Sequence, residues 1–166
     1  MKKTILAIKE RTNNYKITQD VPHYLQARHH ALFTHHLDAI FELSFDGTIV
    51  HCNLASARIT GIPEEHLNGK VFFQFIHTDA RHLAKAAFNA TLKGHHQSYQ
   101  ALSVNRHHHA SQLEVTHVPI IADERMIGVY AICRDITQRK QDENELRLLK
   151  RGIEASPNGV EMADAT

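Results

Sequence analysis

Two alternating apolar segments on either side of Asp46-Gly47 constrain the fold of this chain more than any other feature. Residues 39–45 and 48–52 carry apolar side chains at alternating positions, and this period is typical of β-strands with one buried face. Asp-Gly supplies the positive backbone dihedral that a tight hairpin turn requires. We therefore expect an antiparallel β-hairpin over residues 39–52.

Short helical segments are expected directly after the hairpin. Asn53 is a suitable N-cap for a helix over residues 54–59, and Gly61 is a suitable residue to end that helix. Pro63 then begins another short helical turn over residues 64–67. We expect these segments to cover one face of a sheet.

A dense apolar turn and a longer helix come next. The apolar turn covers residues 71–76, and Thr78 or Asp79 can cap the helix that follows. That helix should end at Gly94, where a left-handed backbone conformation is available without strain. Its apolar residues Leu83, Ala87 and Leu92 predict one buried stripe.

Three strand-like runs and a final charged helix complete the pattern. The runs cover residues 98–105, 112–121 and 126–134, and the helix runs from Asp135 towards Ala155. Consecutive strands joined by short turns pair as antiparallel neighbours. The order of elements therefore predicts an α+β domain with a five-stranded antiparallel sheet and short helices on one face.

The part of the chain before the hairpin predicts a flanking helix. Between Pro22 and Leu37 the apolar residues recur at helical spacing, which indicates an amphipathic helix with one face to bury. Residues 1–21 are mostly polar and aperiodic. We expect them to form a tail or a short arm.

The composition indicates one cytoplasmic domain with short flanking pieces. A chain of 166 residues fits a single domain, and a net charge of +1 gives no electrostatic case for binding nucleic acid or an anionic membrane. No run approaches the roughly 18 apolar residues of a membrane span. The two cysteines, Cys52 and Cys133, lie in apolar strands, and we interpret them as small buried hydrophobic residues.

No motif for catalysis stands out. The chain has no Gly-rich phosphate loop, no G-x-S-x-G and no H-E-x-x-H, so we expect no enzymatic activity from it. Fifteen histidines occur as dispersed pairs and triples rather than in one metal-ligand pattern. We expect no metal site, and keep His82, His107 and His109 as weak candidates.

Four segments of the chain stand in an order and at a spacing typical of one family. They are Asp46-Gly47-Thr48-Ile49-Val50, residues 61–70, Phe75-Ile76-His77-Thr78-Asp79 and residues 127–140, which include Arg134-Asp135-Ile136-Thr137. Together they resemble the PAS family over roughly residues 28–137. The chain departs from the family pattern at Thr78, where proline is usual, and at Ala80, where a second acid often falls.

This resemblance implies a sensory module of a bacterial multidomain signalling protein. The expected parts are a tail with the start of the flanking helix (1–27), the PAS domain (28–137), a linker helix (138–152) and the truncated start of a second PAS domain (153–166). The family also implies a parent with a cyclic-di-GMP output of the GGDEF or EAL type, or a histidine kinase. A purely structural dimerisation domain is a third interpretation.

The resemblance places a pocket or a packed core between the helices and the inner face of the sheet. A hollow core would take a small apolar ligand. No cofactor is expected, although a haem-dependent gas or redox sensor stays as an alternative with His82 as the candidate ligand. The expected pocket residues are Phe72, Phe73, Phe75, Ile76, Leu83, Phe88, Leu102, Val115 and Val129.

The exit from the last strand predicts a signal relay. Asp135 can cap the final helix, and with Ile136 and Thr137 it would tie that helix to the sheet. Further along, apolar residues recur every three to four positions at Leu146, Leu149 and Ile153, which predicts a short two-chain coiled-coil contact. A solvated linker helix is the alternative interpretation. We expect a homodimer through the outer face of the sheet.

Overall fold

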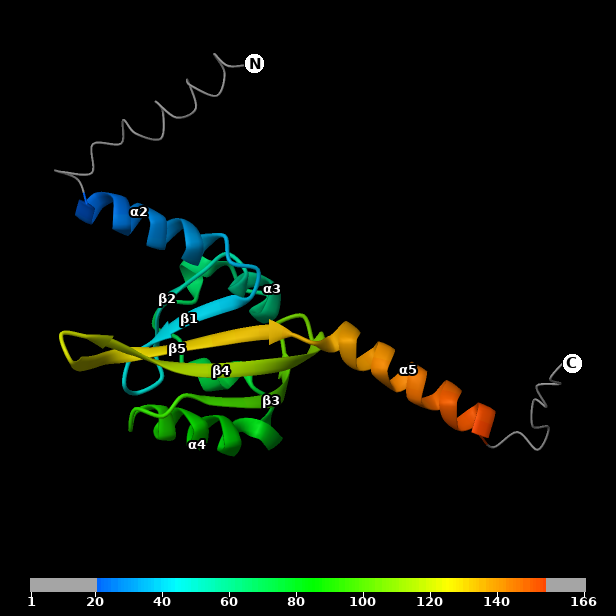
Figure 1. Cartoon of the computed structure of the whole chain (residues 1–166). Coiled ribbons are helices and arrows are strands. Elements are labelled where there is room, and N and C mark those ends of the chain that lie inside the picture. Colours follow the sequence, from blue (N-terminus) through cyan, green and yellow to red (C-terminus); the bar gives the residue numbers. More distant parts are fainter. Residues whose placement is uncertain (1–20, 155–166) are drawn as a thin grey trace, which may run out of the picture.

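The structure is a computed structural model that describes residues 21–154 (Figure 1). Its centre is a five-stranded sheet in the order β2-β1-β5-β4-β3, in which every neighbouring pair is antiparallel. The predicted sheet is confirmed. The strands are β1 (Ala39–Leu43), β2 (Ile49–Cys52), β3 (Gln97–Val104), β4 (Ala110–Ala122) and β5 (Arg125–Asp135).

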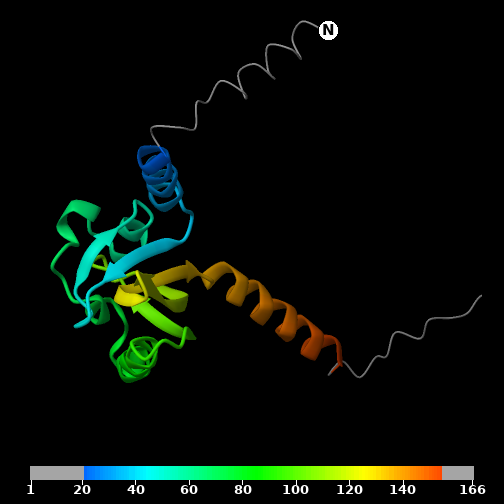
Figure 2. The ribbon, with the colours of Figure 1, turned by 60° about the vertical axis from the view of Figure 1, so that its left-hand side comes forward.

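Short helices connect β2 to β3 and cover one face of the sheet, as predicted. They are α3 (Ser56–Thr60), η1 (Glu64–His66), η2 (Phe72–Phe75), η3 (Thr78–Ala80) and α4 (Arg81–Thr91). Two further helices, α2 (Val21–Thr34) and α5 (Thr137–Glu154), flank this body and project away from it (Figures 1 and 2). The predicted tail before residue 21 and the predicted second PAS start after residue 154 lie outside the described residues.

The hairpin begins as predicted but turns earlier. β1 ends at Leu43, and Phe45, which we expected in the strand, is exposed in the turn. The Asp46 carboxylate holds this turn by accepting hydrogen bonds from the Ser44 hydroxyl and the Thr48 N–H. These bonds lower the pKa of Asp46 to about 2. Gly47 has a φ of +83°, and a Cβ there would lie 2.5 Å from the Phe73 ring, so the turn requires glycine.

Asn53 does not cap the helix that follows, and that prediction is wrong. α3 begins at Ser56 without a side-chain cap. The buried Asn53 side chain points the other way, because its oxygen accepts from the Ile40 N–H at 3.0 Å and its amide group donates to the Asp38 carbonyl at 3.0 Å. Asn53 therefore fixes the start of β1. Gly61 does end α3, with a φ of +69°.

The predicted cap of the long helix is also wrong. A separate 3-10 turn, η3, comes before α4, and its cap is His77, whose Nδ1 accepts from the Asp79 N–H at 3.5 Å. Neither Thr78 nor Asp79 caps α4 with its side chain. The segment that resembles the family motif thus serves as a tight structural turn into α4.

α2 leaves most of its apolar side chains exposed. Phe33 contacts Tyr130 on the outer face of the sheet, with ring centroids 6.3 Å apart. Tyr24, Leu25 and Leu32 are between 54% and 64% exposed, so within one chain this helix leaves most of its predicted apolar face unburied. None of the helices in residues 21–154 is long and apolar enough to cross a membrane.

Candidate functional site

Seven of the nine residues predicted to line a pocket are buried together. β4 and β5 contribute Val115 and Val129 from the sheet, and all seven belong to one continuous core. The other five are Phe72, Phe73, Phe75, Ile76 and Phe88, from η2, the residue after it and α4. Phe72 lies at the centre of the aromatic side chains of this core. The centroid of its ring is 5.3 Å from that of Phe41 and 5.8 Å from that of Phe73.

The other two predicted pocket residues, Leu83 and Leu102, do not face the core. Leu83 is 43% exposed, because the stripe of α4 that faces the core consists of Ala84, Ala87, Phe88 and Thr91 instead. Leu102 lies on the opposite face of β3, because the strand turns Ala101 and Ser103 inward. Ser103 is a polar residue that fits there because its hydroxyl donates to the Phe75 carbonyl at 2.7 Å.

The most unusual group in the core is His117, which sequence reasoning did not single out as a site. It follows Leu113 and Val115 on the inward face of β4 and is completely buried. Three aromatic rings surround it with centroids between 5.4 and 6.0 Å away, those of Phe72, Phe88 and Tyr99. Burial lowers the pKa of His117 to about 4, so the imidazole is neutral at pH 7.

The His117 ring and the nearby Tyr99 hydroxyl lack hydrogen-bond partners. Within residues 24–153, the buried side-chain nitrogen and oxygen atoms without a partner are Nδ1 and Nε2 of His117 and the hydroxyl oxygen of Tyr99. The other buried polar side chains all form hydrogen bonds, namely Asn53, Ser56, Thr60, Thr91 and Ser103. Most buried polar groups in proteins are satisfied, so this pair is an exception that requires an explanation.

The weak metal and haem candidates are not brought together. His82 is exposed on α4, and His107 and His109 are exposed in the turn between β3 and β4. Among the described residues no three histidine, cysteine or acidic side chains lie close enough to bind a metal ion. His82 also points away from the core that a haem would have to occupy.

The exit of β5 is joined to β4 by a set of hydrogen bonds. The Asp135 carboxylate accepts from the Thr137 N–H at 2.8 Å, directly before and at the start of α5. The Thr137 hydroxyl accepts from the Gln112 N–H at 2.9 Å, and the Ile136 N–H donates to the Gln112 carbonyl at 2.8 Å. Ile136 is buried. The first turn of α5 is therefore fixed to the sheet.

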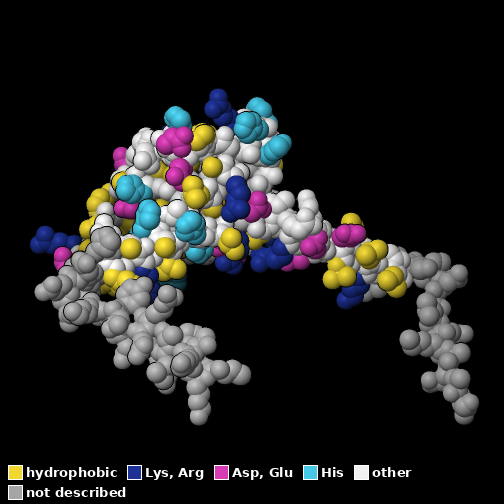
Figure 3. Space-filling model, turned by 90° about the horizontal axis from the view of Figure 1, so that it is seen from above, with side chains coloured by type: hydrophobic (Ala, Val, Ile, Leu, Met, Phe, Trp, Pro, Cys, Tyr) yellow, Lys and Arg dark blue, Asp and Glu magenta, His cyan; other side chains and the backbone are white. Residues whose placement is uncertain are grey.

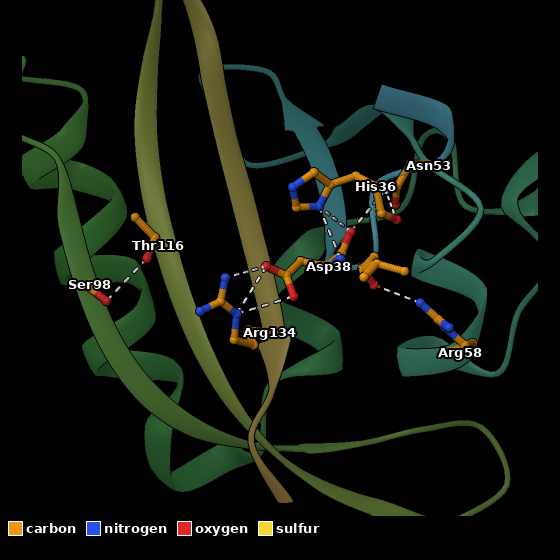
Figure 4. A network of polar contacts seen from close by, with 8 residues as sticks. His36, Asp38, Asn53, Arg58, Ser98, Thr116 and Arg134 are labelled. Atoms are coloured by element: carbon orange, nitrogen blue, oxygen red, sulfur yellow. Dashed lines mark hydrogen bonds and ion pairs between the residues drawn. The ribbon is translucent and has the colours of Figure 1, made fainter. Parts of the chain in front are cut away.

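The entry into β1 is fixed beside this exit (Figure 4). The Arg134 guanidinium pairs with the Asp38 carboxylate at 2.9 Å, and Arg58 donates to the Leu37 carbonyl at 2.7 Å. Asn53 also contacts this segment, through its amide bond to the Asp38 carbonyl. Because Arg134 directly precedes Asp135, the segment after α2 and the segment before α5 share one polar network.

Comparison with known proteins identifies one family that matches most of the chain. The family described as PAS fold matches residues 33–141, which is about two thirds of the chain and includes the whole sheet. No curated protein matches the sequence.

Several solved structures have the same fold. A PAS domain from Colwellia psychrerythraea is 23% identical with a TM-score of 0.61, covering 69% of this chain and 98% of that one. A PAS domain of an HTR-like protein from Haloarcula marismortui is 22% identical with a TM-score of 0.59, covering 69% and 93%. A sensory box histidine kinase/response regulator from Burkholderia thailandensis is 17% identical with a TM-score of 0.58, covering 78% and 99%.

Proposed function

This chain belongs to the PAS fold family, and from that premise we propose that it is a sensory and dimerisation module that passes changes in its core through α5 to an output domain. The module itself is a sensor and not an enzyme. The observation that carries this proposal is the junction of Asp135, Ile136 and Thr137 with Gln112. Through it, a displacement of β4 or β5 moves the start of α5.

The second part of the proposal is that α5 pairs with α5 of a second copy. Its apolar side chains Leu146, Leu149 and Ile153 are between 59% and 74% exposed and fall at the a, d and a positions of a heptad. Figure 3 shows hydrophobic side chains gathered towards the far end of this helix. A single chain leaves this stripe in water, whereas a parallel pair of helices would bury it.

The charges beside the stripe support a parallel pair. In this register Glu145 occupies a g position and Lys150 the e position five residues later, which is the pairing that joins two parallel helices. Both residues are exposed. The apolar part of α5 is short, so we propose that the exposed apolar residues of α2 and the outer face of the sheet add to the contact between the two copies.

Cysteine cross-linking tests the α5 pair. In a Cys52→Ser background, Leu149→Cys is expected to form a covalent dimer under mild oxidation, because d positions of a parallel pair face each other. Cys133 is fully buried and its thiol pKa is raised, so it should not react. The readout is the dimer fraction on a non-reducing gel.

Leu148→Cys in the same background is the matched control. Leu148 neighbours Leu149 and is similarly exposed, but its position lies away from the proposed seam. We expect at least about fivefold less dimer from this variant. Equal cross-linking at the two positions would show random collision and would contradict the pairing.

For the output domain, we propose a histidine kinase in preference to a cyclic-di-GMP enzyme. Both classes are compatible with the sequence, and the Burkholderia thailandensis structure of the same fold is that of a sensory box histidine kinase/response regulator. We also propose that residues 28–137 are the sensory domain, that 138–152 are the linker, and that 153–166 begin a second PAS domain.

A further inference from the structure

Two unpartnered polar groups meet inside the core of this domain. The centroids of the Tyr99 and His117 rings are 5.4 Å apart, one residue on β3 and the other on β4. Tyr99 is 8% exposed and His117 is 0% exposed. A buried donor or acceptor without a partner destabilises the folded state, so keeping both groups in this core is costly unless something binds to them.

We propose that Tyr99 and His117 form the polar end of a binding site for an uncharged, ring-sized organic molecule that carries a hydroxyl or carbonyl group. This inference rests on the proposed sensory function and names the class of its ligand. The binding site lies between the inner face of the sheet and η2, where the core side chains pack against one another in this structure.

The hydrogen-bonding capacity of the pair indicates the polar group of the ligand. A neutral imidazole has one donor and one acceptor, and a phenol hydroxyl can act as both. A hydroxyl group could bond to both residues, and a carbonyl could accept from both. The pKa of His117 is lowered and that of Tyr99 is raised, in both cases mainly by burial. Because both side chains are neutral at pH 7, neither compensates a charge on the ligand.

The aromatic surroundings indicate the body and the size of the ligand. Phe72 and Phe88 pack against His117 with ring centroids 6.0 and 5.8 Å away. η2, which carries Phe72, is one 3-10 turn without a side-chain cap at its start. Rotation of one phenylalanine ring out of this cluster would free the volume of a single aromatic ring.

Binding of three matched probes to the 166-residue chain tests this inference. The probes are p-cresol, toluene and p-toluate, which share a methylphenyl body but differ in having a hydroxyl group, no polar group or a charge. The readouts are thermal melting and the NMR signals of labelled His117 and Tyr99. We expect p-cresol to raise the melting temperature and shift both signals, toluene to bind at least about tenfold more weakly, and p-toluate not to bind.

The double variant Tyr99→Phe, His117→Leu is the matched control. It removes the polar atoms while keeping apolar side chains of similar size, and circular dichroism checks that it is folded. We expect it to bind p-cresol at least about tenfold more weakly than the wild type and toluene at least as well.

Two results would overturn the proposal. One is equal p-cresol binding by the wild type and the double variant; the other is no binding of p-cresol to the wild type, which would favour a filled core that only assembles dimers. Either result would leave the α5 cross-linking outcome unchanged, so the ligand and the helix pairing fail separately.

Discussion

Replacing Phe72 with alanine is expected to lower the free energy of unfolding by about 4 kcal/mol. Phe72 is 1% exposed and contacts the rings of Phe41, Phe73 and His117. The substitution removes a large apolar surface and leaves a cavity that the sheet cannot close. Because single domains are stable by only about 5–15 kcal/mol, this is a large fraction of the total. Urea unfolding followed by circular dichroism measures it.

Val71→Ala is the matched control for this prediction. Val71 precedes Phe72 in the chain but is 45% exposed, so its truncation should cost less than about 1 kcal/mol. If both variants lost similar stability, the aromatic cluster would not be the centre of the core.

Lowering the pH from 7.5 to 5 is expected to destabilise the domain through His117. Burial lowers the pKa of His117 to about 4, whereas an unfolded histidine has a pKa of about 6.5. At pH 5 the unfolded chain therefore binds a proton at His117, whereas the folded chain largely does not. The stabilising contribution is complete above pH 6.5 and is lost as the pH falls towards 4.

The expected loss at pH 5 is about 2 kcal/mol, from the difference between the unfolded pKa and the folded value of about 4. Urea titrations at pH 7.5, 6.5 and 5 measure it. Tyr99 is the titratable group among the three rings around His117, and it stays neutral over this range since its pKa is raised. Asp46, whose pKa is about 2, titrates only below this range.

His117→Leu isolates the contribution of His117 from those of the other histidines. This variant should lose about 2 kcal/mol less than the wild type between pH 7.5 and 5. The same slope in both proteins would mean that His117 is protonated in the folded state, and would contradict a closed, dry core around it.

Most of the fold could be predicted because local patterns agree with it. The alternation on either side of Asp46-Gly47, the glycines that end short helices and the three final strands all indicate the observed elements. The strand boundaries differ by a few residues where a turn has its own hydrogen bonds, as at Ser44.

The errors come from contacts between distant parts of the chain. Asparagine is a common helix cap, but the Asn53 side chain instead forms hydrogen bonds with two backbone groups at the start of β1. Leu102 was expected to face inward because it is apolar. Its neighbour Ser103 faces inward instead, since the Ser103 hydroxyl donates a hydrogen bond to the Phe75 carbonyl there. No local pattern contains these partners.

The candidate site could be predicted only in outline. The aromatic residues of η2 and α4 are visible in the sequence as a dense apolar set, and they do form the core. In the sequence, His117 only continues the alternation of Leu113 and Val115. The same pattern would be seen for an exposed histidine or for a buried histidine with hydrogen-bond partners. Its lack of a partner depends on three elements that meet in space.

The central claim is that the sheet and α5 move together through the junction at Asp135. The most direct test is the distance between spin labels at exposed Gln100 on β3 and Gln141 on α5, in a Cys52→Ser background diluted with unlabelled chain. We predict a single narrow distance distribution that becomes at least about twice as wide in the double variant Asp135→Ala, Thr137→Val, which removes two of the three junction hydrogen bonds. A distribution equally wide in both proteins would contradict the claim.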